Sequence, residues 1–306
     1  MSEIKKAIAD TKQWVEQEKV WDDSLYMTKP TIDVPSPLAG EGARRAGEGT
    51  PHPAPPPSRN EPGLGALVEL RGARSSARGE GTSGVKTTEL KALYEKYKDC
   101  TRCRLGFTRI KIVFGVGNPD SKVLFIGEGP GYEEDRRGEP FVGKSGQLLD
   151  KMMAAIGLSR QTNAYIANIV KCHPMTNPQT PEARGNDRPP SPDEVATCSP
   201  ILLQQIAIIQ PRAIMTLGSP STKMVLHTRD AITGLRGKIV PFDVDYFYPP
   251  ITDMEELQIN VETRETLRRT HVIPTYHPAA LLRNPNLKPE SWSDLKLLRD
   301  ILARQS

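Results

Sequence analysis

Four cysteines have a spacing that is typical of a metal-binding or iron–sulfur site. Cys100 and Cys103 form a C-x-x-C turn, and Cys172 and Cys198 follow with 25 residues between them. Thiolates grouped in this way suit a tetrahedral metal ion or a [4Fe–4S] cluster. A zinc ribbon normally supplies two C-x-x-C turns, and the spacing alone does not choose between zinc and a cluster. Four unrelated buried thiols are the alternative interpretation.

A second candidate for chemistry is the stretch "GEPFVGKS" at 138–145, which matches the phosphate-loop pattern G-x-x-x-x-G-K-S. A working phosphate loop follows its strand directly, whereas the nearest predicted strand ends near Glu128, ten residues before Gly138. The stretch between is acidic, which disfavours a triphosphate. We therefore interpret the match as coincidental, with Lys144 and Ser145 opening a helix.

The elements that must position these residues alternate between strands and helices. Apolar runs predict strands over 122–128, 163–170, 212–218 and 271–278. Helical patterns predict helices over 87–100, 145–158 and 291–305, and a further helix that begins with Ser191 as its N-cap. This alternation predicts a three-layer α/β/α fold around a central, mainly parallel sheet. Sites in such folds form at the carboxyl ends of strands, where Glu128, Asn168, Gly218 and His277 are predicted to lie.

The composition divides the 306-residue chain into unequal parts. We predict an amphipathic helix within residues 1–30, a disordered linker rich in Pro, Gly, Ala and Arg over 31–85, and a globular domain over 86–306. The formal charge of +4 permits nucleic-acid binding without establishing it. No membrane span or signal peptide is apparent, so we expect a cytoplasmic protein with reduced thiols.

Three motifs together resemble the family 4 (type-4) uracil-DNA glycosylases: "GEGPGYEEDRRGEPFVGKSGQLLD", "NIVKCHP" with its following cysteine, and "TYHPAALLRNP". The resemblance covers roughly residues 87–306. It implies an α/β domain that flips uracil out of DNA and hydrolyses its N-glycosidic bond in base excision repair. It also implies a [4Fe–4S] cluster, with Cys100, Cys103, Cys172 and Cys198 as ligands.

The resemblance further implies roles for individual residues. The catalytic residues would be Glu128, Glu134 and His277, and the residues that bind uracil would be Glu128, Gly129, Pro130, Phe141, Asn168, Asn177 and His277. Phe141 would stack on the base, and Asn168 would offer a donor and an acceptor to its edge. A loop with Leu281 or Leu282 as wedge and Arg283 as phosphate partner would enter the duplex.

The chain also departs from the family pattern. The loop between the third and fourth cysteines and the segment 243–269 are longer than usual, and residues 1–85 have no counterpart. The loop 173–190 lacks the Arg-rich run of a branch that links covalently to the abasic sugar, so we expect free turnover.

We expect a monomer whose N-terminal tail contacts a partner. The alternatives are a non-catalytic nucleic-acid-binding module with a Cys₄ metal site, a phosphate-loop ATPase and a redox protein that uses the cluster.

Overall fold

A six-stranded sheet of order β1-β3-β2-β4-β6-β5 forms the centre of the fold. The four inner strands are parallel, and the two short edge strands pair antiparallel with their neighbours. The strands are β1 (Val116–Gly117), β2 (Val123–Gly127), β3 (Tyr165–Asn168), β4 (Ala213–Leu217), β5 (Val240–Pro241) and β6 (His271–Thr275). Because β3 and β4 flank β2 on opposite sides, the strand order reverses at β2, which is where sheets of this kind bind ligands.

The computed structural model describes residues 80–247, 257 and 259–304, all within the unit Arg78–Ser306. The predictions of a helix within 1–30 and of a linker up to residue 79 lie outside these residues. The first described helix begins at Glu80, six residues before the predicted start of the domain.

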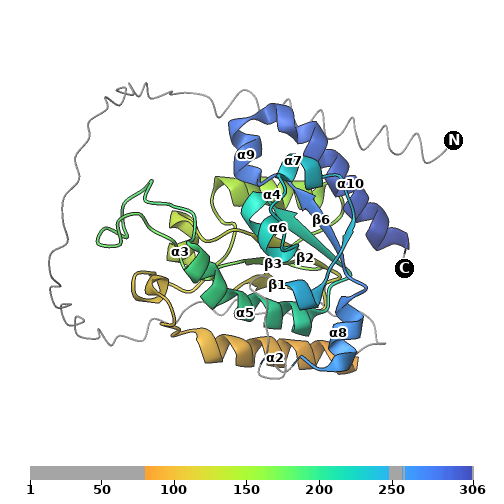
Figure 1. Ribbon diagram of the computed structural model, residues 1–306, viewed down its shortest axis with the longest axis horizontal. Helices are drawn as coiled ribbons and strands as arrows, with labels where there is room; N and C mark the ends of the chain where they lie inside the picture. The colour runs from red at the N-terminus through yellow and green to blue at the C-terminus, as the bar shows by residue number, and fades with distance from the viewer. Residues whose placement is uncertain (1–79, 248–256, 258, 305–306) are drawn as a thin grey trace. The chain divides into compact units, whose positions relative to one another are not determined.

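Helices cover both faces of the sheet (Figure 1). On one face α5 (Pro192–Ile209) packs against α2 (Glu80–Tyr97) and α8 (Val261–Leu267). The opposite face carries α4 (Lys144–Ala154), α6 (Ser219–Val225), α7 (Ile232–Leu235), α9 (Pro278–Arg283) and α10 (Lys288–Arg304). The short helix α3 (Tyr132–Arg137) follows β2, and 3₁₀ turns cover Arg104–Phe107, Val244–Tyr246 and Pro285–Leu287. The three-layer α/β/α prediction is confirmed.

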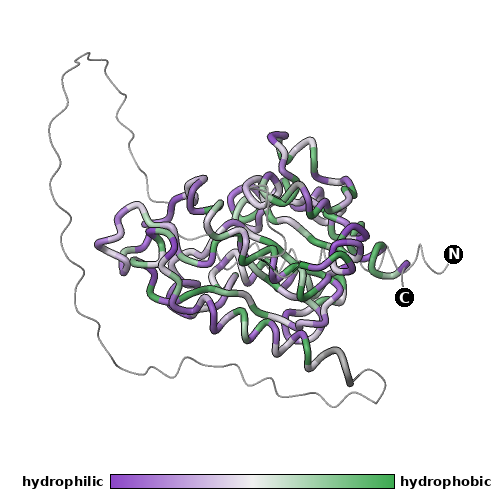
Figure 2. The backbone as a smooth tube through the Cα atoms, turned by 60° about the horizontal axis from the view of Figure 1, so that its bottom comes forward, coloured by the Kyte–Doolittle hydropathy of each residue, from purple (hydrophilic) through white to green (hydrophobic). Residues whose placement is uncertain are grey.

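The inner strands are continuous apolar runs because both of their faces are covered. Every residue of β2, β3 and β4 is buried. Figure 2 shows hydrophobic segments running through the interior of the domain. This pattern is typical of parallel sheets between two helical layers, in contrast to the alternation of a half-exposed strand. The buried strands fix where their carboxyl ends lie, and with them the first residues of each following loop.

The capping signal at Ser191 is confirmed. Its hydroxyl accepts a hydrogen bond from the Glu194 N–H, and the Glu194 carboxylate accepts one from the Ser191 N–H. Several short elements were not predicted, all of seven residues or fewer: α3, α6, α7, α8, α9 and the edge strands β1 and β5. Periodicity has too few turns to register in such short elements.

The described helices include none that is long and apolar enough to cross a membrane.

Candidate active site

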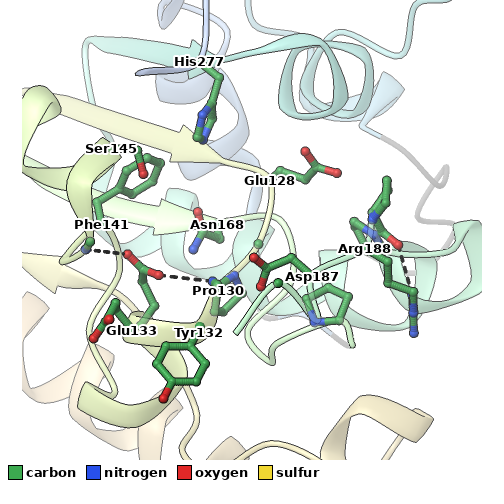
Figure 3. Close-up of a pocket in the computed structure, with 18 of the residues that line it drawn as sticks. Glu128, Pro130, Tyr132, Glu133, Phe141, Ser145, Asn168, Asp187, Arg188 and His277 are labelled. Carbon is green, nitrogen blue, oxygen red and sulfur yellow. Dashed lines mark hydrogen bonds between the residues drawn. The ribbon is translucent and has the colours of Figure 1, made fainter. Parts of the chain in front are cut away.

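A cavity of about 520 Å³ opens beyond the carboxyl ends of β2, β3 and β6. Its walls come from five parts of the chain: the segment after β2, the loop before α4, the end of β3, the loop between β3 and α5, and the start of α9 (Figure 3). Seven of the predicted site residues line this cavity: Glu128, Gly129, Pro130, Glu134, Phe141, Asn168 and His277. The volume is in the range of pockets that enclose a small molecule or a single base.

Asn168 is the last residue of β3 and its side chain is an unsatisfied polar group. Only 1% of the residue is exposed, and its Oδ1 atom has no hydrogen-bond partner among the residues that the structure describes. In the parallel register Asn168 lies beside Gly127, where a Cβ atom would come within 2.5 Å of both Asn168 Oδ1 and the Phe141 ring. A glycine at 127 therefore keeps the amide and the ring in place. Leaving a buried acceptor unpaired costs about 1–3 kcal/mol, which indicates a ligand as its partner.

Phe141 lies in the cavity wall with an unusual backbone conformation. Its φ of 55° falls in the left-handed region, which non-glycine residues rarely adopt. A buried guanidinium holds this turn, because Arg160 donates to the carbonyl oxygens of Pro140 (2.9 Å) and Phe141 (2.8 Å) and pairs with Asp150. A Cβ atom on Gly146 would lie 1.9 Å from the Phe141 carbonyl oxygen, so only a glycine allows the first turn of α4 to approach the Phe141 backbone this closely.

His277 caps α9 and has a defined tautomer. Its Nδ1 atom accepts a hydrogen bond from the Ala279 N–H at 3.1 Å, so the proton of the neutral ring must sit on Nε2. Burial, with a smaller contribution from the positive charge of Arg283, lowers the pKa of His277 to about 4. The ring centroids of His277 and Phe141 are 5.6 Å apart. His277 is therefore a neutral hydrogen-bond donor at the pocket.

The two predicted catalytic carboxylates, Glu128 and Glu134, have different surroundings. Glu128 directly follows β2, burial raises its pKa, and within the described part of the chain no group hydrogen-bonds to its carboxylate. Glu134 is engaged by the backbone: its Oε1 atom accepts from the N–H groups of Val142 and Gly143 at 2.9 Å, and its Oε2 atom accepts from Gly131. Glu128 is thus available to a ligand, whereas Glu134 holds two loops together.

The same contacts explain the phosphate-loop match. The N–H groups of Val142 and Gly143, just before α4, point to the Glu134 carboxylate, so a protein anion occupies the position that a phosphate would take. Lys144 is exposed and opens α4, as predicted. These two N–H groups are therefore not available to a triphosphate.

Four predicted contact residues do not line the cavity: Asn177, Leu281, Leu282 and Arg283. Asn177 is exposed and does not line the cavity. Its backbone groups bond to the buried side chain of Asn186, which closes the loop between them. In α9, Leu281 is buried, Leu282 is partly exposed and Arg283 is exposed.

The four cysteines are free thiols in one neighbourhood. Cys172 and Cys198 belong to the hydrophobic core, against which Cys100 and Cys103 pack. Burial raises the pKa of Cys172 to about 12 and that of Cys198 to about 11, although nearby cations act in the opposite direction. Such thiols ionise only when a metal takes the place of their proton.

The donors around the sulfurs fit an anionic thiolate centre. Arg109 donates to Cys172 Sγ at 3.5 Å, and the backbone N–H of Lys171 donates to Cys198 Sγ at 3.3 Å. N–H groups directed at sulfur are a common feature of iron–sulfur sites. Among the described residues, no three His, Cys, Asp or Glu side chains are arranged to hold a single metal ion. A cluster of four irons is held by sulfurs that lie farther apart than the ligands of one ion.

Sequence reasoning missed a histidine beside the pocket. His173 is fully buried, and its Nε2 atom lies 2.6 Å from Asp187 Oδ1 in the cavity wall. Burial lowers the pKa of His173, but the hydrogen bond to Asp187 and the negative charge of Asp135, whose Oδ2 atom lies 3.8 Å from Nδ1, outweigh this and raise it to about 9. The local motif "KCHP" does not predict this pairing, because Asp135 lies in α3 and Asp187 lies 14 residues further along the chain.

The family model described as the uracil DNA glycosylase superfamily matches residues 114–296. The chain is 37% identical to the type-4 uracil-DNA glycosylase of Sulfurisphaera tokodaii, over 69% of this chain and 84% of the relative. It is 33% identical to the type-4 enzyme of Archaeoglobus fulgidus, over 67% of this chain and 89% of the relative. A type-4 enzyme of Thermotoga maritima is 37% identical, over 62% of this chain and 81% of the relative.

The matched region contains β2, β3, β4 and β6 and every residue that lines the cavity. The chain belongs to the uracil-DNA glycosylase superfamily.

Proposed function

We propose that this chain is a type-4 uracil-DNA glycosylase, which removes uracil from DNA by hydrolysis of the N-glycosidic bond in DNA repair. The observation that carries the proposal is the unpaired amide oxygen of Asn168, buried in a pocket between the Phe141 ring and the neutral His277 imidazole. Family membership and the type-4 relatives support it. The redox, ATPase and non-catalytic interpretations do not account for this pocket.

Asn168 and Phe141 recognise the base. The uracil ring stacks on Phe141, since an aromatic face is a suitable platform for a flat base. The Asn168 amide offers an acceptor to the N3–H of uracil and a donor to an adjacent carbonyl oxygen. Cytosine has an unprotonated N3 and an amino group at that edge, so it leaves the Asn168 oxygen without a partner. Unpaired groups of this kind are the strongest source of discrimination between similar ligands.

His277 stabilises the leaving base. As the N-glycosidic bond breaks, electrons move onto the uracil ring and its O2 atom becomes negative. The Nε2–H of His277 donates a hydrogen bond to this oxygen, and the bond strengthens as the charge develops. Since the pKa of His277 is about 4, the ring acts as a hydrogen-bond donor and not as a proton source at neutral pH.

Glu128 acts on the sugar side of the bond. The sugar develops positive charge in the transition state, and a carboxylate without internal partners stabilises that charge and orients the attacking water. Its raised pKa makes Glu128 a better proton acceptor than an exposed glutamate. Gly129 and Pro130 complete the turn beside the base.

Glu134 takes a positioning role in this proposal. Its three backbone hydrogen bonds tie the turn after β2 to the loop that carries Phe141. The carboxylate also adds negative charge to the pocket wall, which favours the cationic sugar.

The target nucleotide must leave the helix before it reaches this pocket. In α9, Leu282 is the side chain available to wedge between bases, because Leu281 is committed to the core. Arg283 at the end of the helix is exposed and contacts a backbone phosphate. Asn177 contributes only through the shape of its loop.

A [4Fe–4S] cluster on Cys100, Cys103, Cys172 and Cys198 is the cofactor in this proposal. Its ligands would come from the segment after α2, the segment after β3 and helix α5, so a bound cluster would hold these three parts of the chain together. The buried thiols with N–H and guanidinium donors support this assignment. A monomeric state, a cytoplasmic location and a partner for the tail remain predictions from the sequence.

The test is incubation of the purified chain with a uracil-containing oligonucleotide, followed by alkali to cleave abasic sites. We expect strand cleavage at uracil and none in a matched oligonucleotide with cytosine. Absence of cleavage, while a known uracil-DNA glycosylase cleaves the same substrate, would contradict the activity. Iron and acid-labile sulfide per chain test the cluster separately, and zinc in their place would contradict it.

A further inference from the structure

Lys171 is a fully buried lysine that the proposed reaction does not use. It lies between Asn168 and Cys172, and 1% of the residue is exposed. Its side chain is among the largest that the fold buries completely. A buried ammonium group is costly unless opposite charge and hydrogen bonds compensate it.

The contacts of Lys171 connect two regions. Its Nζ atom donates a 2.7 Å hydrogen bond to the backbone carbonyl oxygen of Asn168, the residue whose side chain reaches into the pocket. Its backbone N–H donates to Cys198 Sγ, and its carbonyl oxygen accepts from the Val113 N–H. Lys171 therefore contacts both the end of β3 and the cysteine centre.

The charge of Lys171 has no carboxylate to balance it within the described residues. Burial lowers the pKa of Lys171, and among the described residues the groups that oppose this are the sulfurs of Cys198 and Cys172. Neutral thiols would leave the ammonium unpaired, whereas four thiolates around a metal centre carry net negative charge. The buried lysine and the thiolate centre thus compensate each other, as partners in the surroundings of metal sites commonly do.

We propose that Lys171 is a positioning residue that couples the thiolate centre to base recognition. Its ammonium is the counter-ion of the cluster, and its hydrogen bond to the Asn168 carbonyl holds the end of β3 in the conformation that aims the amide at uracil. The cluster then supports activity through the geometry of Asn168 without taking part in the reaction. This inference rests on the proposed function and on the proposed cluster.

Two substitutions separate the two roles of Lys171. Lys171→Met removes the charge and the donor, whereas Lys171→Gln removes the charge and keeps an amide donor. For each full-length protein, iron and sulfide content, the rate of iron loss to a chelator, and kcat and KM on a uracil oligonucleotide are measured. Lys86→Met is the matched control, because the Lys86 ammonium also donates to a backbone carbonyl, that of Ile209, but is influenced by Asp120 and Glu89 instead of sulfurs.

For Lys171→Met we expect iron loss to be roughly tenfold faster and KM to rise roughly tenfold, with a smaller change in kcat. Lys171→Gln should lose iron as fast as Lys171→Met but keep a KM closer to that of the unmodified chain. Lys86→Met should match the unmodified chain in both measurements.

Unchanged iron retention in both Lys171 variants would overturn the counter-ion role, and equal KM values in Met and Gln variants would overturn the positioning role. If Lys171→Met does not fold, Lys171→Gln still tests the proposal. Iron loss from Lys171→Gln at the same rate as from the unmodified chain would contradict it. An unmodified chain that contains no iron contradicts the cluster itself, and one that cleaves no uracil DNA contradicts the proposed function. Both outcomes concern the unmodified chain, so they can be distinguished from the outcomes that contradict the role of Lys171.

Discussion

The inner wall and the outer rim of the pocket are built in different ways. The inner wall consists of Asn168, Phe141 and His277, whose positions depend on strand ends and on buried hydrogen bonds to the backbone. The outer rim is the loop of residues 176–188, which is largely exposed. It contacts α3 through Arg184, which lies over the Tyr132 ring at 4.7 Å and pairs with Glu133.

This difference indicates which parts of the site determine the chemistry. Buried charged groups that bond to carbonyl oxygens cannot be replaced by water, so their loss shifts the backbone. Exposed ion pairs contribute about 0–1 kcal/mol, because water and salt compete for both partners. We therefore expect substitutions in the inner wall to affect catalysis strongly, and substitutions in the outer rim to affect DNA binding weakly.

The largest effect is expected at Asn168. Asn168→Ala removes the only amide that faces the base in this account, and kcat/KM on uracil DNA should fall by about 10²–10³-fold. Single-turnover cleavage of a uracil oligonucleotide measures this loss of activity, with circular dichroism as a control for folding. A decrease of less than about threefold would remove Asn168 from the inner wall as a recognition residue.

Glu128 should give the next largest effect, together with a change in pH dependence. Burial raises its pKa, so the carboxylate gains a proton at a higher pH than an exposed glutamate, and activity should fall as pH decreases through that range. His277 stays neutral until the pH approaches 4 and does not cause this decrease. In Glu128→Gln we expect a rate about 10–100-fold lower and no acidic limb in the pH profile. An acidic limb that persists unchanged would show that another group is responsible.

Arg160 tests whether the inner wall depends on its support. Arg160→Met removes two hydrogen bonds to the carbonyl oxygens of Pro140 and Phe141 and should lower the free energy of unfolding by about 2–4 kcal/mol. We expect kcat/KM to fall about tenfold, because Phe141 loses its left-handed conformation. Arg268→Met is the control, since its ion pairs are half-exposed, and it should change stability far less than Arg160→Met. Equal losses of stability in the two variants would contradict the distinction.

The smallest effect is expected in the outer rim. Arg184→Ala removes the stacking on Tyr132 and the pair with Glu133, and kcat should change by less than about threefold at saturating DNA. The Kd for DNA should rise modestly and more so at low salt, which filter binding at two ionic strengths can measure. A fall in kcat comparable to that of Asn168→Ala would show that the outer rim takes part in catalysis, and would contradict the proposed difference between the outer rim and the inner wall.

The sequence predicted those parts of the site that follow directly from strand ends. Asn168 and His277 come at or just after apolar runs, so their meeting at one edge of a parallel sheet could be inferred. The roles of Arg160, His173 and Lys171 could not, because their partners lie in other loops or in the backbone and leave no local pattern. Asn177 was expected in the pocket, but the closure of its loop by Asn186 keeps it on the surface.

Glu134 shows the limit of motif reading most clearly. The letters "GEPFVGKS" describe a loop whose N–H groups converge, and the structure confirms two of these donors before α4. The pattern does not reveal that an upstream carboxylate already accepts them. Only the turn at α3, too short to predict from periodicity, brings Glu134 to that position.

The central claim is that the inner wall selects uracil and supports its excision. The most direct test measures base release from otherwise identical oligonucleotides that contain either uracil or cytosine at one position, with the unmodified chain in excess. We predict release of uracil alone, with loss of that release in Asn168→Ala and its retention in Arg184→Ala. Release of both bases at similar rates, or of neither, would contradict the account.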